Sequence, residues 1–451
     1  MISLKEALKL DNAGIADLRK ELKEKIKANS KLGAYIEQLT NAEISDDYAG
    51  VPIAIKDNIQ VKGWAITSCS KILQGYVAPY NATAIEKLLG AGLAPFGRTN
   101  MDEFAMGSTT ESSFYGKTLN PLDHTRVPGG SSGGSACAVG GGLAVAALGS
   151  DTGGSIRQPA AFCGCVGFKP SYGRVSRYGL AAYSSSLDQI GPITQSVEDA
   201  AILYDIIAGY DEKDTTSANV DFTPTTPNLD PNKKYKIALV KNYTDDASDE
   251  VKKAIYLAAD RLKAAGHEIS EVSLSSAKYA IAAYYIIATA EASANLSRYD
   301  GVRYGRRADA QSLGAMYAAT RGEGFGPEVQ RRMLLGTFVL SSGYYDAYYI
   351  KAQKARAFIS AAYEKVLGDA DALLMPIAPH AAYKFGELAD PLSAYLSDVY
   401  TVSVNLAGLP AISVPVTKNT DGLNISAQII GAQWAEQKVL DIAASLEASS
   451  K

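Results

Sequence analysis

Histidine and cysteine are scarce in this sequence. Its 451 residues include three histidines (His124, His267, His380) and four cysteines (Cys69, Cys137, Cys163, Cys165). The pair Cys163 and Cys165 lacks the C-x-x-C spacing of zinc and redox motifs, and no second pair completes a site. We therefore expect no metal site and no disulfide framework, but reduced and mostly buried thiols. None of the histidines has an acidic partner in a recognisable Ser-His-Asp motif.

An excess of positive charge is also missing. The formal net charge is −4 at pH 7, which argues against direct nucleic-acid binding through a broad basic surface. The first ten residues carry two lysines and one glutamate instead of the apolar core of a signal peptide, and no membrane span is visible. With 47% hydrophobic residues, the composition predicts a globular protein with a large core and a cytoplasmic location.

Nucleotide-binding loops are absent as well. A phosphate-binding loop needs a glycine-rich turn followed by Lys-Ser or Lys-Thr. No lysine lies between Lys117 and Lys169, where the glycines are densest, and no G-x-G-x-x-G follows a strand. We therefore expect this chain to bind no cofactor of its own.

What the sequence does contain is a segment from Pro128 to Pro170 that is crowded with glycine and serine. We interpret residues 136–148 as one helix, with Ser131 at its entry and Ser155 on the loop after the next strand. In the sequence Asp-Thr-Gly-Gly-Ser that ends at Ser155, the backbone N–H groups around Thr152, Gly153 and Gly154 are little shielded by side chains. Such a nest can stabilise an oxyanion beside a serine nucleophile.

A serine nucleophile needs a base, and Lys56 is the candidate. It ends the apolar stretch that begins at Val51 and is predicted to be a buried strand. Burial disfavours the charged form of lysine and lowers its pKa, here from about 10.4 toward roughly 7–8. A hydroxyl both donates and accepts a hydrogen bond, so Ser131 is a candidate relay between Lys56 and Ser155.

These segments, VPIAIKDNI, GGSSGGSA and DTGGSIRQPA, resemble the amidase signature family. The resemblance implies a Ser–cis-Ser–Lys triad in which Ser155 is the nucleophile, Ser131 follows a cis peptide bond and bridges, and Lys56 is the base. It also implies that residues 100–108, NMDEFAMGS, line the floor of the site. The implied fold is an α/β amidase signature fold, with a mixed central β-sheet covered by helices on both faces.

The alternation of predicted strands and helices agrees with that α/β class. Residues 1–45 are interpreted as an N-terminal helical arm and residues 46–451 as the amidase signature domain. Within that domain, residues 211–234 are rich in Thr, Pro, Asn and Asp and are predicted to form a loop-rich linker.

Residues 295–306 and 322–353 resemble one branch of the family, the amidase subunits of bacterial aminoacyl-tRNA amidotransferases. A free amino acid substrate needs a cation for its α-carboxylate and an anion for its α-ammonium group. Arg332 suits the first role by bidentate contact and Asp398 suits the second. Tyr284 is the third expected contact, with Tyr285 one register position away. The structural alternatives are a surface salt bridge for Arg332 and a helix cap for Asp398.

This resemblance implies a glutaminase subunit that supplies ammonia for converting Glu-tRNA(Gln), and also Asp-tRNA(Asn) in some systems, to the amide form. It implies a kinase-like partner subunit that binds ATP, Mg²⁺ and the misacylated tRNA, and a small third subunit, giving a heterotrimer without membrane contact. Two alternatives stay open: a free-standing amidase that acts on simple amides, and a non-catalytic scaffold subunit with an unused site.

Overall fold

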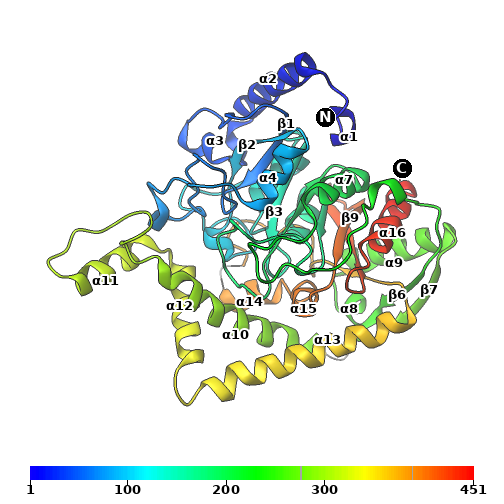
Figure 1. Ribbon diagram of the computed structural model, residues 1–451. Coiled ribbons are helices and arrows are strands. Elements are labelled where there is room, and N and C mark those ends of the chain that lie inside the picture. Colours follow the sequence, from blue (N-terminus) through cyan, green and yellow to red (C-terminus); the bar gives the residue numbers. More distant parts are fainter. Residues whose placement is uncertain (275–276, 389, 451) are drawn as a thin grey trace.

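A computed structural model describes residues 1–274, 277–388 and 390–450 (Figure 1). The strands are β1 (Val51–Lys56), β2 (Leu93–Thr99), β3 (Ala146–Asp151), β4 (Val166–Lys169), β5 (Gln189–Thr194), β6 (Lys236–Val240), β7 (Glu268–Val272), β8 (Ala372–Pro376), β9 (Ala411–Lys418) and β10 (Asn424–Gly431). The α-helices are α1 (Leu4–Ala7), α2 (Asn12–Ala28), α3 (Ile36–Thr40), α4 (Thr83–Gly90), α5 (Gly133–Gly140), α6 (Arg157–Cys163), α7 (Val197–Ile207), α8 (Lys241–Asp245), α9 (Asp249–Ala264), α10 (Ala277–Asn295), α11 (Leu313–Gly324), α12 (Pro327–Leu340), α13 (Lys351–Asp369), α14 (Pro391–Leu396), α15 (Val402–Leu406) and α16 (Glu436–Ala448).

The ten strands form one mixed sheet in the order β2-β1-β3-β5-β4-β9-β10-β8-β6-β7. β1 pairs in parallel with β2 and β3, whereas β5, β4, β9 and β10 are joined by antiparallel pairing. The predicted β-α-β unit, β6-α9-β7, extends the same sheet through parallel pairing of β6 with β8. The central strands are buried along their whole length, which explains why their sequences are nearly continuous apolar runs.

Helices cover both faces of the sheet, as expected. α4, α7, α16 and α9 pack against the strands on one face, and α5 and α6 pack on the other. Beyond α5 and α6 lies a further layer in which α10 contacts α12, α13 and α15 (Figure 1). The segment between β3 and α6 lies between the sheet and this outer layer, where Gly153 approaches Tyr284 of α10 and Gly154 approaches Thr401 beside α15.

The single helix predicted for residues 136–148 is wrong. α5 ends at Gly140, and β3 begins at Ala146. Three consecutive glycines interrupt the apolar run, and the last, Gly142, has a φ of +71°, which an α-helix does not accommodate. The apolar residues after the glycines form a buried strand, because a short apolar run fits a central strand as well as it fits a helix.

Residues 1–45 contain α1, α2 and α3, at the top of Figure 1. Leu4, Leu22 and Ile26 join the same apolar core as the sheet. Residues 211–234 form a loop whose only regular element is a short 3-10 helix, η4 (Thr226–Asn228).

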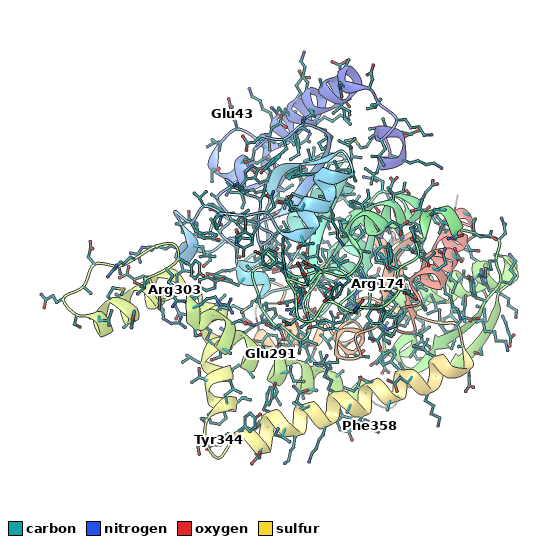
Figure 2. All side chains as sticks on the ribbon, viewed as in Figure 1. Glu43, Arg174, Glu291, Arg303, Tyr344 and Phe358 are labelled. Carbon is teal, nitrogen blue, oxygen red and sulfur yellow. The ribbon has the colours of Figure 1, made fainter. Side chains whose placement is uncertain are left out.

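Two helix boundaries in the outer layer differ from the expectation. Arg331 and Arg332 lie in the middle of α12 and not at its start, because Gly326 and Pro327 begin the helix. The predicted helix over residues 343–367 begins as a π-helical turn, η6 (Asp346–Ile350), and continues as α13 to Asp369. Figure 2 shows Tyr344 and Phe358 along the outer edge of this arm.

The four cysteines are free and buried, which confirms the expectation of unpaired interior thiols. Across the residues that the structure describes, no helix combines the length and apolar character needed to cross a bilayer.

Candidate active site

Lys56 is the last residue of β1, and its side chain is completely buried. Its Nζ atom donates hydrogen bonds to the hydroxyls of Ser131 at 2.7 Å, Ser132 at 2.8 Å and Ser150 at 2.9 Å. Burial lowers the pKa of Lys56 to about 7, although the carboxylates of Asp102 and Asp151 act in the opposite direction. A lysine with this pKa exchanges its proton near neutral pH, as a general base requires.

Ser131 lies directly before α5, and the Gly130–Ser131 peptide bond is cis, as the resemblance implied. The backbone on both sides is fixed by hydrogen bonds: the Gly130 N–H donates to Oε1 of Gln158 at 2.9 Å, and the Ser131 carbonyl accepts from the Asp102 N–H at 3.3 Å. The Ser131 hydroxyl is therefore held in the buried space that Lys56 reaches.

Ser155 lies on the loop between β3 and α6, close to Ser131. The Ser132 N–H donates to the Ser155 carbonyl at 3.1 Å, which ties the two serine segments together. The Ser155 side chain is 8% exposed and lines a small cavity. Within the described residues its hydroxyl makes no hydrogen bond, so the structure brings Lys56 and Ser131 into direct contact and places Ser155 beside them without a bonded hydroxyl.

The loop of predicted oxyanion donors is organised by Asp151. Its carboxylate accepts hydrogen bonds from the N–H groups of Gly154 at 2.8 Å and Ile156 at 3.1 Å. The Gly154 N–H is thus committed to Asp151, and the Thr152 hydroxyl donates to Asp188 at 2.7 Å. The geometry leaves the N–H groups of Gly153 and Ser155 as the donors closest to the nucleophile.

Arg157 carries out the structural role expected for an ion-pair residue. Its guanidinium is fully buried and contacts Asp151, with Nε 3.0 Å from Oδ2. It also donates to Gln428 and to Asn405. Burial by itself would raise the pKa of Asp151, but the charge and hydrogen bonds of Arg157 hold that pKa well below its usual range. Asp151 is therefore a permanent anion that fixes the loop before Ser155.

Arg332 points from α12 into the same cavity as Ser155. Its Nε donates to Glu328 at 2.7 Å and its Nη1 to the hydroxyl of Tyr183 at 2.7 Å. With 4% exposure it is not the surface salt bridge that the sequence also allowed. In the described part of the chain, Nη2 has no hydrogen-bond partner, which leaves one donor pair for an anion.

Asp398 faces the cavity from the segment between α14 and α15. Its carboxylate accepts from the Ser108 hydroxyl at 2.9 Å and from the Tyr285 hydroxyl at 3.1 Å. Because the side chain makes these long-range contacts and α15 begins after Thr401, the helix-cap alternative is wrong. Burial raises the pKa of Asp398 to about 6, so its carboxylate is mainly ionised at neutral pH.

Tyr284 and Tyr285 both line the cavity. Tyr284 lies against the nucleophile loop, since a Cβ added to Gly153 would stand 2.5 Å from its hydroxyl oxygen. Tyr285 instead holds Asp398 and stacks on Tyr395, with ring centroids 4.0 Å apart. The predicted floor is present too, because Ala105, Gly107 and Ser108 line the same cavity.

Several residues of the site escaped sequence reasoning. Ser132 and Ser150 share Lys56 with Ser131, and Tyr183 shares Arg332 with Glu328. Glu328 had a detectable signal, because it lies four residues before Arg332 on one helix. Tyr183 had none, because its contact spans 149 residues of sequence.

Comparison with known proteins agrees with this site. A sequence profile of the amidase family matches residues 21–440. The chain belongs to the amidase family. It is 76% identical over 447 residues to the A-type subunit of glutamyl-tRNA(Gln) amidotransferase from Campylobacter fetus subsp. fetus, covering 99% of both chains. It is 67% identical over 448 residues to the protein of the same name from Campylobacter jejuni, again with 99% of both chains covered.

Solved structures of the family share the fold. The crystal structure of the A-type glutamyl-tRNA(Gln) amidotransferase subunit from Thermotoga maritima superposes with a TM-score of 0.85 at 43% identity. That match covers 100% of this chain and 95% of the other. The amidase signature fold and the resemblance to the amidotransferase branch are therefore both confirmed.

Proposed function

We propose that this chain is the glutamine-hydrolysing subunit of a glutamyl-tRNA(Gln) amidotransferase. The observation that carries the proposal is one cavity lined by Ser155, Arg332 and Asp398, with Lys56 buried behind Ser131. The cavity joins a nucleophile to a cation and an anion, which is what an amide-bearing free amino acid requires. A simple amide would use the nucleophile but neither charged group.

The first half of the reaction forms an ester between Ser155 and the substrate. Ser155 Oγ attacks the side-chain carbonyl carbon of glutamine while its proton passes to Ser131, whose own proton passes to the neutral amine of Lys56. The oxyanion that develops is stabilised by the N–H groups of Gly153 and Ser155. Lys56 then returns a proton through Ser131 to the departing nitrogen, and ammonia leaves.

The second half regenerates the enzyme. Water attacks the γ-glutamyl ester and loses its proton by the same route through Ser131 to Lys56. The ester bond breaks, Ser155 recovers its proton, and glutamate is released. The ammonia from the first half is the product that a partner would use.

The partner is inferred from the relatives, which are named as subunits of a glutamyl-tRNA(Gln) amidotransferase. We infer that ammonia passes to a tRNA-binding subunit that uses ATP and Mg²⁺ to activate the glutamyl group of the misacylated tRNA. A small third subunit completes the proposed heterotrimer, and Asp-tRNA(Asn) is a second candidate acceptor. The net charge of −4 supports this division, because tRNA binding is left to the partner.

Glutamine recognition rests on the two charged side chains. Arg332, held by Glu328 and Tyr183, offers Nη2 to the α-carboxylate, and Asp398 accepts from the α-ammonium group. Tyr284 is the proposed third contact, because its hydroxyl lies beside Gly153 on the substrate side of the nucleophile loop.

The test compares glutamine with amides that lack the charged groups. We expect the chain, co-purified with its partner subunits, to release ammonia from L-glutamine far faster than from acetamide or benzamide. Replacing Arg332 with methionine is expected to lower kcat/KM for glutamine about 100-fold, because truncating one partner of a buried charge pair costs about 2–5 kcal/mol. The effect should fall mainly on KM, measured from ammonia release.

The matched control is Arg331→Met on the same helix. Arg331 is exposed and pairs with Glu328 at the surface, so we expect less than about a threefold change in kcat/KM. Strong turnover of simple amides without turnover of glutamine would instead favour a free-standing amidase. A complex that is complete and binds tRNA but hydrolyses no amide would favour a scaffold subunit.

The pH dependence provides a separate prediction. Because burial lowers the pKa of Lys56 to about 7, the base is neutral above that pH and protonated below it. We therefore expect kcat/KM for glutamine to rise with pH and to reach half its plateau near pH 7, with a steeper fall below pH 6 as Asp398 also gains a proton. Initial rates between pH 5 and pH 8.5 check this, and a flat profile across pH 6–8 would contradict it.

A further inference from the structure

Glu103 is a buried carboxylate outside the triad and outside the substrate pair. Its side chain belongs to a residue that is 4% exposed, at the start of the short helix η3 (Glu103–Ala105). One oxygen accepts from the Ser70 hydroxyl, and the other accepts from the Gly326 N–H at 2.9 Å. Burial raises the pKa of Glu103 to about 7, which reflects how little water surrounds it.

The Gly326 contact places Glu103 at the N-terminus of α12. Gly326 is the N-cap residue of this helix, and it has no side chain with which to cap. Pro327 follows at the first helical position, which lacks an N–H group. A carboxylate at this end also interacts favourably with the helix dipole. A Cβ on Gly326 would collide with Oε2 of Glu103, so glycine is what permits the close approach.

α12 is the helix that carries Arg332 and Glu328. Arg332 lies six residues after Gly326, and its guanidinium must reach the cavity that Ser155 lines. Tyr183 and Glu328 fix the direction of the guanidinium, but neither fixes the start of the helix. The Glu103 carboxylate does so directly.

The other side of Glu103 leads to the floor of the cavity. The chain continues through Phe104, which packs against Phe325 with ring centroids 5.7 Å apart, to Ala105 and Ser108. Ala105 lines the cavity, and Ser108 donates to Asp398. Glu103 therefore stands where the floor that supports Asp398 meets the helix that supports Arg332.

We propose that Glu103 is a positioning residue that anchors the N-terminus of α12 and thereby sets Arg332 for the α-carboxylate of glutamine. This inference rests on the proposed glutaminase function and adds a determinant of substrate affinity to it. Glu103 acts through Arg332 and does not touch substrate. Its loss should therefore change KM for glutamine and leave the chemical step, which depends on Lys56, Ser131 and Ser155, nearly unchanged.

The test uses Glu103→Ala in the full chain, purified with its partner subunits. We expect KM for glutamine to rise about tenfold and kcat to change less than about twofold, because a displacement on the order of 1 Å at a positioned group has effects of this size or larger. Glu103→Gln should restore KM to within about twofold, since the amide oxygen still accepts from the Gly326 N–H. The matched control is Glu323→Ala, which removes an exposed acid of the neighbouring α11 and should leave KM unchanged.

A double-variant cycle separates positioning from general destabilisation. In the Arg332→Met background, Glu103→Ala should produce no further rise in KM, because the group that it positions is gone. Additive effects of the two substitutions would overturn the inference, as would an unchanged KM in Glu103→Ala. A fall in kcat with unchanged KM would also overturn it.

Ser70→Ala provides a second variant if Glu103→Ala does not yield folded protein. It removes the hydroxyl that holds the Glu103 carboxylate, so KM should rise about two- to threefold in the same direction, and an unchanged KM would overturn the inference. Failure of the proposed function looks different: the parent complex itself would then release no ammonia from glutamine. Failure of the inference leaves the parent active and only the variants without the predicted KM shift.

Discussion

Replacing Lys56 with methionine is expected to lower kcat for glutamine hydrolysis by about 10⁴-fold. Methionine keeps much of the side-chain volume in a site that is completely buried, so packing should be retained while the amine is lost. Without that amine, the proton of Ser131 has no acceptor, and Ser155 remains a neutral alcohol. The measurement is kcat from ammonia release at saturating glutamine.

A second buried lysine in the sheet provides the matched control. Lys169, at the end of β4, is 1% exposed, and burial lowers its pKa to about 7 as well. Its Nζ donates only to the Pro170 carbonyl among the residues described, and it contacts neither Ser131 nor Ser155. Lys169→Met is therefore expected to retain kcat within about fivefold.

The pair of variants distinguishes a specific base from a general requirement for buried positive charge. Similar losses in Lys56→Met and Lys169→Met would contradict the assignment of Lys56 as the base. Equal unfolding midpoints for parent and Lys56→Met, measured in urea, would show that the loss of kcat arises in the chemistry and not in the fold.

The sequence allowed the nucleophile region to be predicted because its signals are local. The glycines before Ser131 and Ser155 exclude side chains, and the apolar strand before Lys56 implies burial. These signals lie within a few residues of the groups that they describe. The same local reasoning failed for residues 136–148, where an apolar run was compatible with a helix and with a strand until the glycines at 140–142 divided it.

The surroundings of the charged residues could not be predicted in this way. Asp398 receives its hydrogen bond from Ser108, 290 residues earlier, and Arg332 receives support from Tyr183. Such contacts depend on how the outer helices are placed over the sheet, and no local pattern encodes that placement. The commitment of the Gly154 N–H to Asp151 is equally tertiary, because Arg157, Asn405 and Gln428 hold the carboxylate and guanidinium in place.

Replacing Arg157 with methionine is expected to lower the free energy of unfolding by about 3–5 kcal/mol. Both members of the Arg157–Asp151 pair are fully buried, so removing the cation leaves the Asp151 carboxylate without its neutralising partner. The acceptors on Asn405 and Gln428 also lose their donor. The measurement is urea-induced unfolding of parent and variant at pH 7.

The control is Arg306→Met, which removes a partly exposed ion pair with Glu323 and should change the unfolding free energy by less than about 1 kcal/mol. Arg157→Met/Asp151→Asn should recover part of the loss, because it removes the uncompensated charge while the amide oxygen can still accept from Gly154. A single variant as stable as the parent would contradict the view that this pair anchors the loop. Activity that stays low in the stabilised double variant would mean that the charge of Asp151 also serves the reaction, by holding the N–H groups around Ser155 in register with the oxyanion.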